Sequence, residues 1–303
     1  MSYFVSIVIP TYNRGVYLRN TVHALLKQDY PFLEIIIVDQ SDDLALGIKA
    51  DAFDKECKVK YFRSNEIGPP AAKNYGISKA QGEIILTLDD DIIPEQNLIV
   101  SHIQHYSNPD IVSVAGRVFR PGEEEIHTMK VGRVKPNGLI LGNFTSSMKT
   151  TVESAMGCNL SYRKDIFKKI GGYNTHYVGN FVREESDLCF KIRRLGYKII
   201  YEPEARILHV KAPRGGCRIE NDLIWQFFFL HNNTLFFLNH MKRYYLPFFL
   251  YEHLKRAMKH FYHHGKKYKD LRFLVRGIHL GYLTYKRGFF DQDRYGKYRN
   301  EDS

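Results

Sequence analysis

A buried strand that ends in three consecutive carboxylates constrains the fold of this 303-residue chain more than any other stretch. Residues 84–88 form the apolar run IILTL, and Asp89, Asp90 and Asp91 follow it directly, shortly before Pro94. Carboxylates this close repel one another, so the folded state needs a cation or hydrogen-bond donors beside them. The stretch therefore predicts an interior strand with an acidic end that requires compensation.

Two kinds of compensation are open from the residues alone. A hard divalent ion, Mn²⁺ or Mg²⁺, is typically held by one or two carboxylates, and we assign that role to Asp89 and Asp91. A helix beginning near Pro94 or Glu95 would instead place its positive end beside an acid. This second interpretation is the one we prefer for Asp90.

Repeated β-α units surround this strand. Residues 4–10 (FVSIVIP) and 34–39 (EIIIVD) are apolar runs, and residues 14–28 show the spacing of a helix. We predict an α/β fold with a mostly parallel sheet and helices on both faces. Ligands bind beyond the carboxyl ends of the strands in such a sheet. The residues expected to meet there are Thr11, Tyr12, Asp39 and Asp89.

A lysine near the start of another expected helix needs an anionic partner. Gly68, Pro69 and Pro70 begin this helix after a short strand over residues 59–62, and Lys73 lies in its first turns. The positive end of a helix disfavours a cation, so Lys73 is expected to pair with something negative, for which a diphosphate would serve.

The order of VSIVIPTYNR, EIIIVDQSDD, GPPAAKNYGI and GEIILTLDDDIIP resembles the nucleotide-binding half of the inverting GT-A glycosyltransferases of family 2, which includes bacterial polysaccharide enzymes. The resemblance implies that Asp39 binds the nucleobase. It also implies that Asp89 and Asp91 hold the metal and the sugar nucleotide, with Asp91 as the metal ligand. Lys73 stands where the family usually has arginine, and Gln40 departs from the family pattern. The remaining donor contacts implied in this half are Thr11, Tyr12, Arg14 and Asp90.

The segment SAMGCNLSYRKDIFKKIGGY, residues 154–173, is similar to the family's second signature. The similarity implies a strand whose Gly157 and Asn159 lie beside the donor sugar, followed by a helix over 163–170 that ends at Gly171-Gly172. Gly157 permits close backbone approach. Asn159 could equally satisfy a turn.

A cluster of acids begins the next expected helix, from Glu184 onward. The helix dipole and capping alone would favour acids in this first turn. The run also looks like the family's Glu-Asp segment, which implies Glu185 as the general base and Glu184 as a donor contact. Because glutamate replaces the usual aspartate, the base could be shifted by one position. Asp187 is expected to orient loops or cap the helix.

His209 ends the apolar strand ARILHV and precedes KAPRGG. A histidine at a strand end is often structural. In the family a histidine at this place commonly completes the metal or diphosphate site, so both roles remain open. Arg214 and Arg218 are expected in a loop that closes over phosphate.

The chain is expected to divide into a GT-A catalytic domain over 1–216 and a helical segment over 217–303. The catalytic domain would consist of a nucleotide-binding half, 1–119, and an acceptor half, 120–216. Residues 120–150 lack helical periodicity, so we expect an excursion that lines the acceptor side or is only a surface hairpin.

The C-terminal segment is basic and aromatic. Residues 241–303 contain 15 Lys and Arg against six acids, and aromatic residues crowd positions 223–249. A second helix is expected with Leu250, Leu254, Met258 and Phe261 on its apolar face. Such helices bind anionic lipid surfaces, so we expect peripheral membrane contact. A helical lid packed on the catalytic domain is the alternative.

Cysteine usage and the N-terminus favour a cytoplasmic location, at the inner face of the cell membrane. The four cysteines show no CxxC pair and no metal-ligand spacing with histidine. The first residues, MSYFVSIVIP, lack the basic region and apolar core of an export signal. No window of about 18 apolar residues predicts a spanning helix.

The predicted activity is inverting, metal-dependent transfer of a sugar from a nucleotide-diphospho-sugar. The acceptor would be a hydroxyl of a glycan or lipid-linked oligosaccharide in cell-surface polysaccharide synthesis. One alternative is a sugar nucleotidyltransferase, which usually has a Gly-rich basic loop where this chain has PTYNRG. The other is a non-enzymatic basic protein that binds membranes or nucleic acid. No RNA-binding signature accompanies the aromatics, so we expect no nucleic-acid partner.

Overall fold

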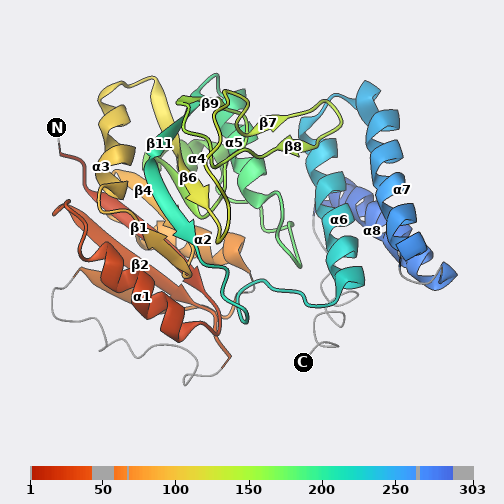
Figure 1. Ribbon diagram of the computed structural model, residues 1–303, viewed down its shortest axis with the longest axis horizontal. Coiled ribbons are helices and arrows are strands. Elements are labelled where there is room, and N and C mark those ends of the chain that lie inside the picture. The colour runs from red at the N-terminus through yellow and green to blue at the C-terminus, as the bar shows by residue number, and fades with distance from the viewer. Residues whose placement is uncertain (1, 43–57, 67, 264–266, 289–303) are drawn as a thin grey trace.

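The structure is a computed structural model that describes residues 2–42, 58–66, 68–263 and 267–288. An α/β body with one large twisted sheet stands beside a group of three C-terminal helices (Figure 1). The part of the expected charge surplus that falls on residues 289–303 lies outside the described residues.

The central sheet has nine strands and is mixed, with most of its neighbours parallel in the N-terminal half. The pairs β1–β2, β1–β4, β2–β3 and β6–β11 are parallel, while β10 and β5 run antiparallel to their neighbours. In spatial order the strands are β3 (Val59–Arg63), β2 (Leu33–Asp39), β1 (Val5–Thr11), β4 (Ile84–Leu88), β10 (Asn159–Arg163), β6 (Ile111–Phe119), β11 (Lys198–His209) and β5 (Ile92–Pro94), with β9 (Thr150–Val152) paired to β11.

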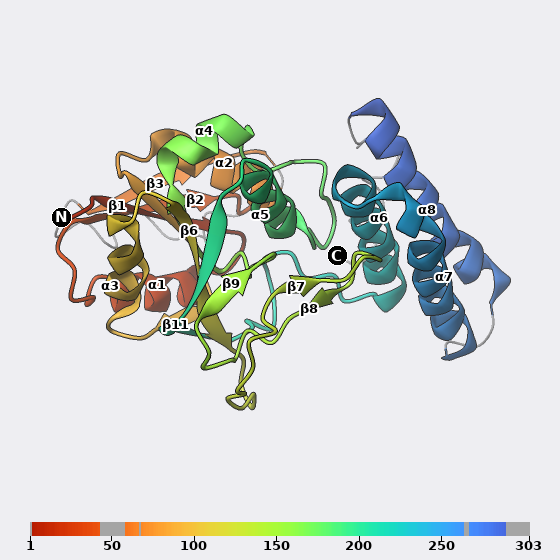
Figure 2. The same ribbon diagram turned by 90° about the horizontal axis from the view of Figure 1, so that it is seen from above.

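Helices cover both faces of the sheet, as Figure 2 shows from above. The alternation of strand side chains explains this, because Ile7 and Ile9 of β1 join one core cluster and Val8 joins the other. One face carries α1 (Gly15–Leu25), α3 (Leu98–Ile103) and a short 3₁₀ turn (Gln104–Ser107); the other carries α2 (Pro69–Lys79), α4 (Lys164–Ile170) and α5 (Glu184–Arg194). The predicted α/β architecture is confirmed.

The expected helix near Pro94 is wrong. Pro94 ends the short strand β5, and α3 begins only at Leu98. Asp90 therefore caps no helix. The apolar pair Ile92-Ile93 extends far enough to pair with the end of β11, which places a strand where the charge pattern alone favoured a helix start.

The excursion over residues 120–150 forms a hairpin, β7 (Arg133–Val134) and β8 (Ile140–Leu141), as its lack of helical periodicity predicted. The hairpin reaches from the α/β body toward the C-terminal helices (Figure 2). Its part in acceptor binding stays a prediction.

The C-terminal segment folds as α6 (Asp222–His240), a 3₁₀ turn (Arg243–Tyr245), α7 (Leu246–His263) and α8 (Tyr268–Arg287). The aromatic rings of α6 are largely core: Phe227, Phe228, Phe236 and Phe237 are all buried. None of the described helices has the length and apolar character needed to cross a bilayer.

The side of α7 that is buried in the protein is not the apolar face predicted from the sequence. Leu254 is 42% exposed, and the buried positions are Phe249, His253, Ala257 and His260. Burial lowers the pKa of His253 to about 4, so its ring is neutral and packs against Phe249 and Phe229 as an aromatic side chain. A pattern that treats histidine as polar therefore assigns the buried side of the helix incorrectly.

Glu202 is a buried carboxylate at a bulge of β11, 0% exposed. It accepts hydrogen bonds from His105 Nε2 (2.7 Å) and the backbone N–H of Glu204 (3.0 Å), and Lys149 Nζ lies 2.6 Å away. Burial opposes ionisation, but these donors outweigh it and lower the pKa of Glu202 to about 2. The ionised side chain thus stabilises the fold at neutral pH.

We predict that Glu202→Gln lowers the free energy of unfolding at pH 7 by about 1–3 kcal/mol, because a buried site loses its charged acceptor. The folded-state pKa is depressed, so this stabilisation is complete above the unfolded value of about 4.3 and is lost as pH falls toward about 2. Urea unfolding across that pH range should show the free energies of unfolding of the wild type and of Glu202→Gln becoming equal as the pH falls. Glu204→Gln, at an exposed neighbour, is the control, and equal stabilities at pH 7 would refute the assignment.

Candidate active site

The three acids after β4 lie in different environments. Asp90 is buried, accepts a hydrogen bond from Thr11 Oγ1 (2.7 Å) and pairs with Arg14 Nη1 (3.0 Å). Burial raises the pKa of Asp90 to about 7, with the Arg14 charge opposing that shift and the Asp91 charge adding to it. Asp90 therefore links the acidic segment to β1 through Thr11 and to the turn after β1 through Arg14.

Asp91 is fully enclosed and has one carboxylate oxygen available. Its Oδ2 lies 3.1 Å from Arg14 Nη1 and accepts from the backbone N–H of Ala212 (2.8 Å). Its Oδ1 is buried, has no hydrogen-bond partner among the described residues and lies 3.3 Å from His209 Nε2. A buried oxygen without a donor is the ligand atom that a cation would satisfy.

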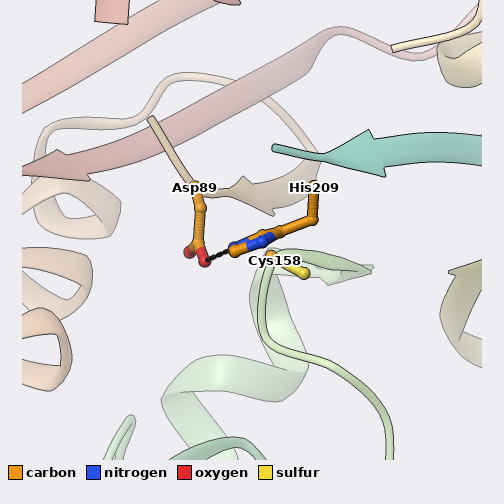
Figure 3. A group of neighbouring side chains, drawn as sticks. All are labelled: Asp89, Cys158 and His209. Carbon is orange, nitrogen blue, oxygen red and sulfur yellow. Dashed lines mark hydrogen bonds and ion pairs between the residues drawn. The ribbon is translucent and has the colours of Figure 1, made fainter. Parts of the chain in front are cut away.

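Asp89 is half-buried and turns toward His209, whose Nε2 lies 3.2 Å from Asp89 Oδ2 (Figure 3). Burial favours neutral forms of both groups, but the hydrogen bond and mutual charge lower the pKa of Asp89 and raise that of His209. His209 comes from the end of β11, so β4 and β11 deliver the two side chains to one point.

Cys158 completes this group, with ligand atoms of Asp89, Cys158 and His209 all within 4.8 Å of one another (Figure 3). Cys158 and His209 are far apart in the sequence, so no local pattern predicted that they lie close together. Burial raises the pKa of the Cys158 thiol well above its usual range, so the sulfur is neutral. A neutral thiol is a poor ligand for Mn²⁺ or Mg²⁺, whereas the two carboxylates and the imidazole suit a divalent cation.

The loop after β11 is tied over the acids by Arg14. The guanidinium donates to the carbonyl oxygens of Arg214 (3.0 Å) and Gly215 (3.1 Å), and the Gly216 N–H donates to Tyr12 O (2.8 Å). Arg214 contributes its backbone, and its side chain is exposed. A side chain at Gly216 would collide with the Arg14 guanidinium, which explains the glycine.

A cavity of about 890 Å³ opens in front of the acids, within the size range of ligand pockets. The sequence-predicted residues that line it are Thr11, Tyr12, Arg14, Asp89, Asp90, His209 and Arg218. Asp39 lies beneath, buried, where its oxygens accept from the Ser41 N–H (2.8 Å) and the Tyr61 hydroxyl (2.6 Å). The strands thus gather these side chains at one edge, as predicted.

Other lining residues were missed by the sequence reasoning. Arg63 ends β3 beside Asp39 in the sheet register, so the strand-end rule could have found it. Lys211, Asn180 and Trp225 come from loops and from α6, and no local pattern marks them.

The anionic partner of Lys73 is Glu184. Their side chains form an ion pair in which Lys73 is 2% and Glu184 6% exposed. Despite burial, which disfavours the charge, Glu184 and Asp89 raise the pKa of Lys73. The protein thus supplies the negative charge that the helix position demands, and contact with a diphosphate stays a prediction.

Glu185 follows at the start of α5. Burial and the Glu184 charge raise the pKa of Glu185 to about 7. A Cβ placed on Gly157 would lie 3.3 Å from Glu185 Cβ and 3.1 Å from Lys73 Nζ, so the backbone at Gly157 passes close to both side chains. Because Gly157 precedes Cys158, the same turn adjoins the group formed by Asp89, Cys158 and His209.

Asn159 is fully buried with all of its amide engaged. Its Nδ2 donates to the carbonyls of Arg117 (3.1 Å) and Ala205 (2.8 Å), and its Oδ1 lies 2.9 Å from His102 Nε2. These contacts join three strands and account for the side chain without a ligand, so its predicted donor contact remains without support.

Helix α6 holds the segment that carries Glu185. Arg183, in a left-handed conformation (φ 85°), donates to Asn233 Oδ1 (2.6 and 2.9 Å) and to the Gly138 carbonyl (3.1 Å). His240 Nε2 lies 2.6 Å from Asp187 Oδ1. Asp187 therefore links two helices, and the expected boundary at residue 216 is crossed by buried polar contacts.

We predict that Lys73→Met destabilises the fold by about 3–5 kcal/mol, because it leaves the Glu184 carboxylate buried without a partner. The double variant Lys73→Met/Glu184→Gln should be less destabilised than the single one. Urea unfolding measures both, and Lys79→Met, at an exposed position of the same helix, is the control. Equal stabilities of the single and double variants would contradict the pairing.

Comparison with known proteins identifies the family to which the chain belongs. The family model described as Glycosyl transferase family 2 matches residues 6–171, more than half of the 303 residues. The glycosyltransferase GlyG of Streptococcus pneumoniae serotype 4 is 38% identical over 128 residues, which cover 41% of this chain and 42% of GlyG. A glucosyl-dolichyl phosphate glucuronosyltransferase of Haloferax volcanii is 28% identical over 224 residues, 68% of each chain.

A solved structure agrees on the fold. The mannosyltransferase PcManGT of Pyrobaculum calidifontis, in complex with GDP-Man and Mn²⁺, matches with a TM-score of 0.57 and 17% identity over 91% of this chain and 74% of its own. The matched family and relatives favour a glycosyltransferase over the nucleotidyltransferase and non-enzymatic alternatives, and the chain spans less than half the length of GlyG. The chain belongs to glycosyl transferase family 2 and has the GT-A fold.

Proposed function

We propose that this glycosyltransferase is metal-dependent and inverting, and that it uses a nucleotide-diphospho-sugar. The observation that carries the proposal is the buried Oδ1 of Asp91, which has no hydrogen-bond partner among the described residues and lies 3.3 Å from Nε2 of His209, a residue that with Asp89 lines the large cavity. Asp89, Asp91 and His209 would hold Mn²⁺ or Mg²⁺. When bound, such an ion supplies Lewis-acid neutralisation of the departing diphosphate.

Glu185 is the proposed general base. Its carboxylate would accept the proton of the acceptor hydroxyl while that oxygen bonds to the anomeric carbon and the bond to the diphosphate oxygen breaks. A single displacement inverts the anomeric centre, and the nucleoside diphosphate leaves. Its elevated pKa of about 7 suits a base that works near neutral pH.

The donor would lie in the large cavity, with Tyr12 and Arg63 toward the nucleobase end and Arg14 and Lys211 toward the phosphates. Asp39 does not line this cavity, and its predicted contact with the nucleobase remains part of the proposal. The Mn²⁺ and GDP-Man named for PcManGT support a nucleotide-sugar donor. The dolichyl phosphate in the name of the Haloferax volcanii relative supports a lipid-linked acceptor, the alternative being a soluble glycan in polysaccharide synthesis.

Peripheral contact with an anionic membrane remains part of the proposal, through one face of α7 and its preceding turn. Tyr244, Phe248, Tyr251 and Tyr262 are each about 60% exposed on it, with Lys255 5.9 Å from the ring centroid of Tyr251. Exposed aromatic and basic side chains on one helix suit the interface of anionic lipid at the inner face of the cell membrane.

We predict that Asp91→Asn abolishes Mn²⁺-dependent binding of the donor, because it removes a charged ligand. Glu185→Gln should keep donor binding and reduce sugar transfer by at least about 100-fold. Calorimetric titration of sugar nucleotides with Mn²⁺ separates the two effects. Full sugar transfer by Glu185→Gln would show that another residue is the base. The released product should be nucleoside diphosphate rather than pyrophosphate.

The pH dependence of transfer should report the same base. Because Glu185 must be deprotonated to accept a proton, kcat/KM is expected to fall as pH drops through about 7. The rate measured with Mn²⁺ between pH 5 and 9 tests this. A rate that is flat across pH 6–8 would show that no group of that pKa limits the step.

For the membrane, we predict that Phe248→Ser/Tyr251→Ser weakens partitioning onto anionic vesicles at least threefold, because both side chains would insert at the interface. Phe32→Ser, at a 51% exposed aromatic of the α/β body, is the control. Point variants are preferable to truncation, since α6 holds Arg183 and Asp187 in place. Unchanged vesicle sedimentation would refute the contact.

A further inference from the structure

A second cavity, of about 400 Å³, lies at the end of α5 opposite to Glu185. It is bounded by β9, the start of β11 and the last residue of α6. Its ionisable lining is dominated by cations: Arg133, Arg193, Arg194 and Lys198 face one acid, Glu153, and one histidine, His240.

This cavity is separate from the donor cavity. Lys198 begins β11 and His209 ends it, so the two sites lie at opposite edges of the sheet. Lys198 and Leu208 of the bulged strand β11 lie opposite Ile111 and Phe119 of β6. Eight steps of about 3.3 Å along β6 put the two ends roughly 26 Å apart. The cluster of cations is therefore not explained by the diphosphate of the sugar donor.

The cations are only partly compensated by the protein. Arg193 pairs with Glu153 (3.0 Å), and Arg194 donates to the backbone carbonyl of Asn239. Neither Arg133 nor Lys198 forms an ion pair with any acid in the described part of the chain. The dipole of α5 favours the two arginines at its C-terminal end, but Arg133 and Lys198 come from β7 and β11.

His240 supplies an independent observation. Its side chain is 1% exposed and its Nε2 lies 2.6 Å from Asp187. Its Nδ1 is also buried, yet it has no hydrogen-bond partner among the described residues. A buried ring nitrogen without a partner, in the wall of a basic cavity, indicates a missing ligand atom.

We propose that this basic cavity binds a phosphate-bearing anion. Guanidinium groups match phosphate oxygens in a bidentate arrangement, and Lys198 adds a point charge. The volume exceeds what inorganic phosphate needs, so the ligand class is a phosphomonoester, either a small soluble one or a phosphate lipid headgroup. The bound anion would adjoin His240 and, through it, Asp187 of α5, the helix whose first turn carries Glu185.

The test uses the full chain in EDTA, so that phosphate cannot bind through a metal at the donor site. Inorganic phosphate is titrated calorimetrically, and sedimentation is measured on phosphatidylcholine vesicles with and without phosphatidic acid. The variant is Arg133→Gln/Lys198→Gln. The matched control is Lys135→Gln/Lys169→Gln, which removes the same charge from exposed positions outside the cavity.

We expect the cavity variant to weaken phosphate binding at least tenfold, while the control binds as the wild type does. Phosphate should also shift the NMR resonance of the His240 ring in the wild type and not in the variant. Loss confined to the phosphatidic acid arm would identify a lipid headgroup as the ligand. Equal binding by variant and control in both arms would overturn the proposal. Donor binding is not measured, so either result is independent of the proposed transfer reaction.

Discussion

Compensation of the carboxylates after β4 is the interaction on which the rest of the site depends. Arg14 pairs with Asp90 and Asp91, and the His209 ring lies between Asp89 and Asp91, so two basic side chains from distant segments meet three acids. These contacts hold the loop after β11 over the cavity and leave Asp91 Oδ1 without a hydrogen bond from any described residue. The protein therefore tolerates the cluster before any ligand binds and keeps an acceptor available for a cation.

The first of the C-terminal helices, α6, supports the segment of the candidate active site that carries Glu185. Buried polar side chains of α6 form hydrogen bonds with the α/β body. Asn233 accepts from Arg183, Asn232 binds the backbone of Val178, and His240 contacts Asp187. All of these contacts fall on the segment around Glu185. An aromatic, hydrophobic helix with a few buried amides thus positions the proposed base, while the exposed aromatics of α7 remain available for another surface.

Several predictions followed from patterns that are local. The strands that end at Asp39 and Leu88, and the helix that begins at Glu184, follow from apolar runs and from turn residues beside them. The errors have local causes too. The charge pattern after Asp91 suggested a helix start where the backbone pairs as a strand, and the buried, neutral His253 was not recognised as part of the packed side of α7.

By itself, then, the sequence determined the fold class, the acidic edge of the sheet and the residues gathered there, because periodicity and strand ends are encoded within a few residues. Only the tertiary structure decided which charges pair. Lys73 and Glu184 are 111 positions apart, and Cys158 reaches His209 from the turn before β10. Such pairs depend on how whole elements pack, and the energy of a buried ion pair depends on its enclosure, which no local pattern records.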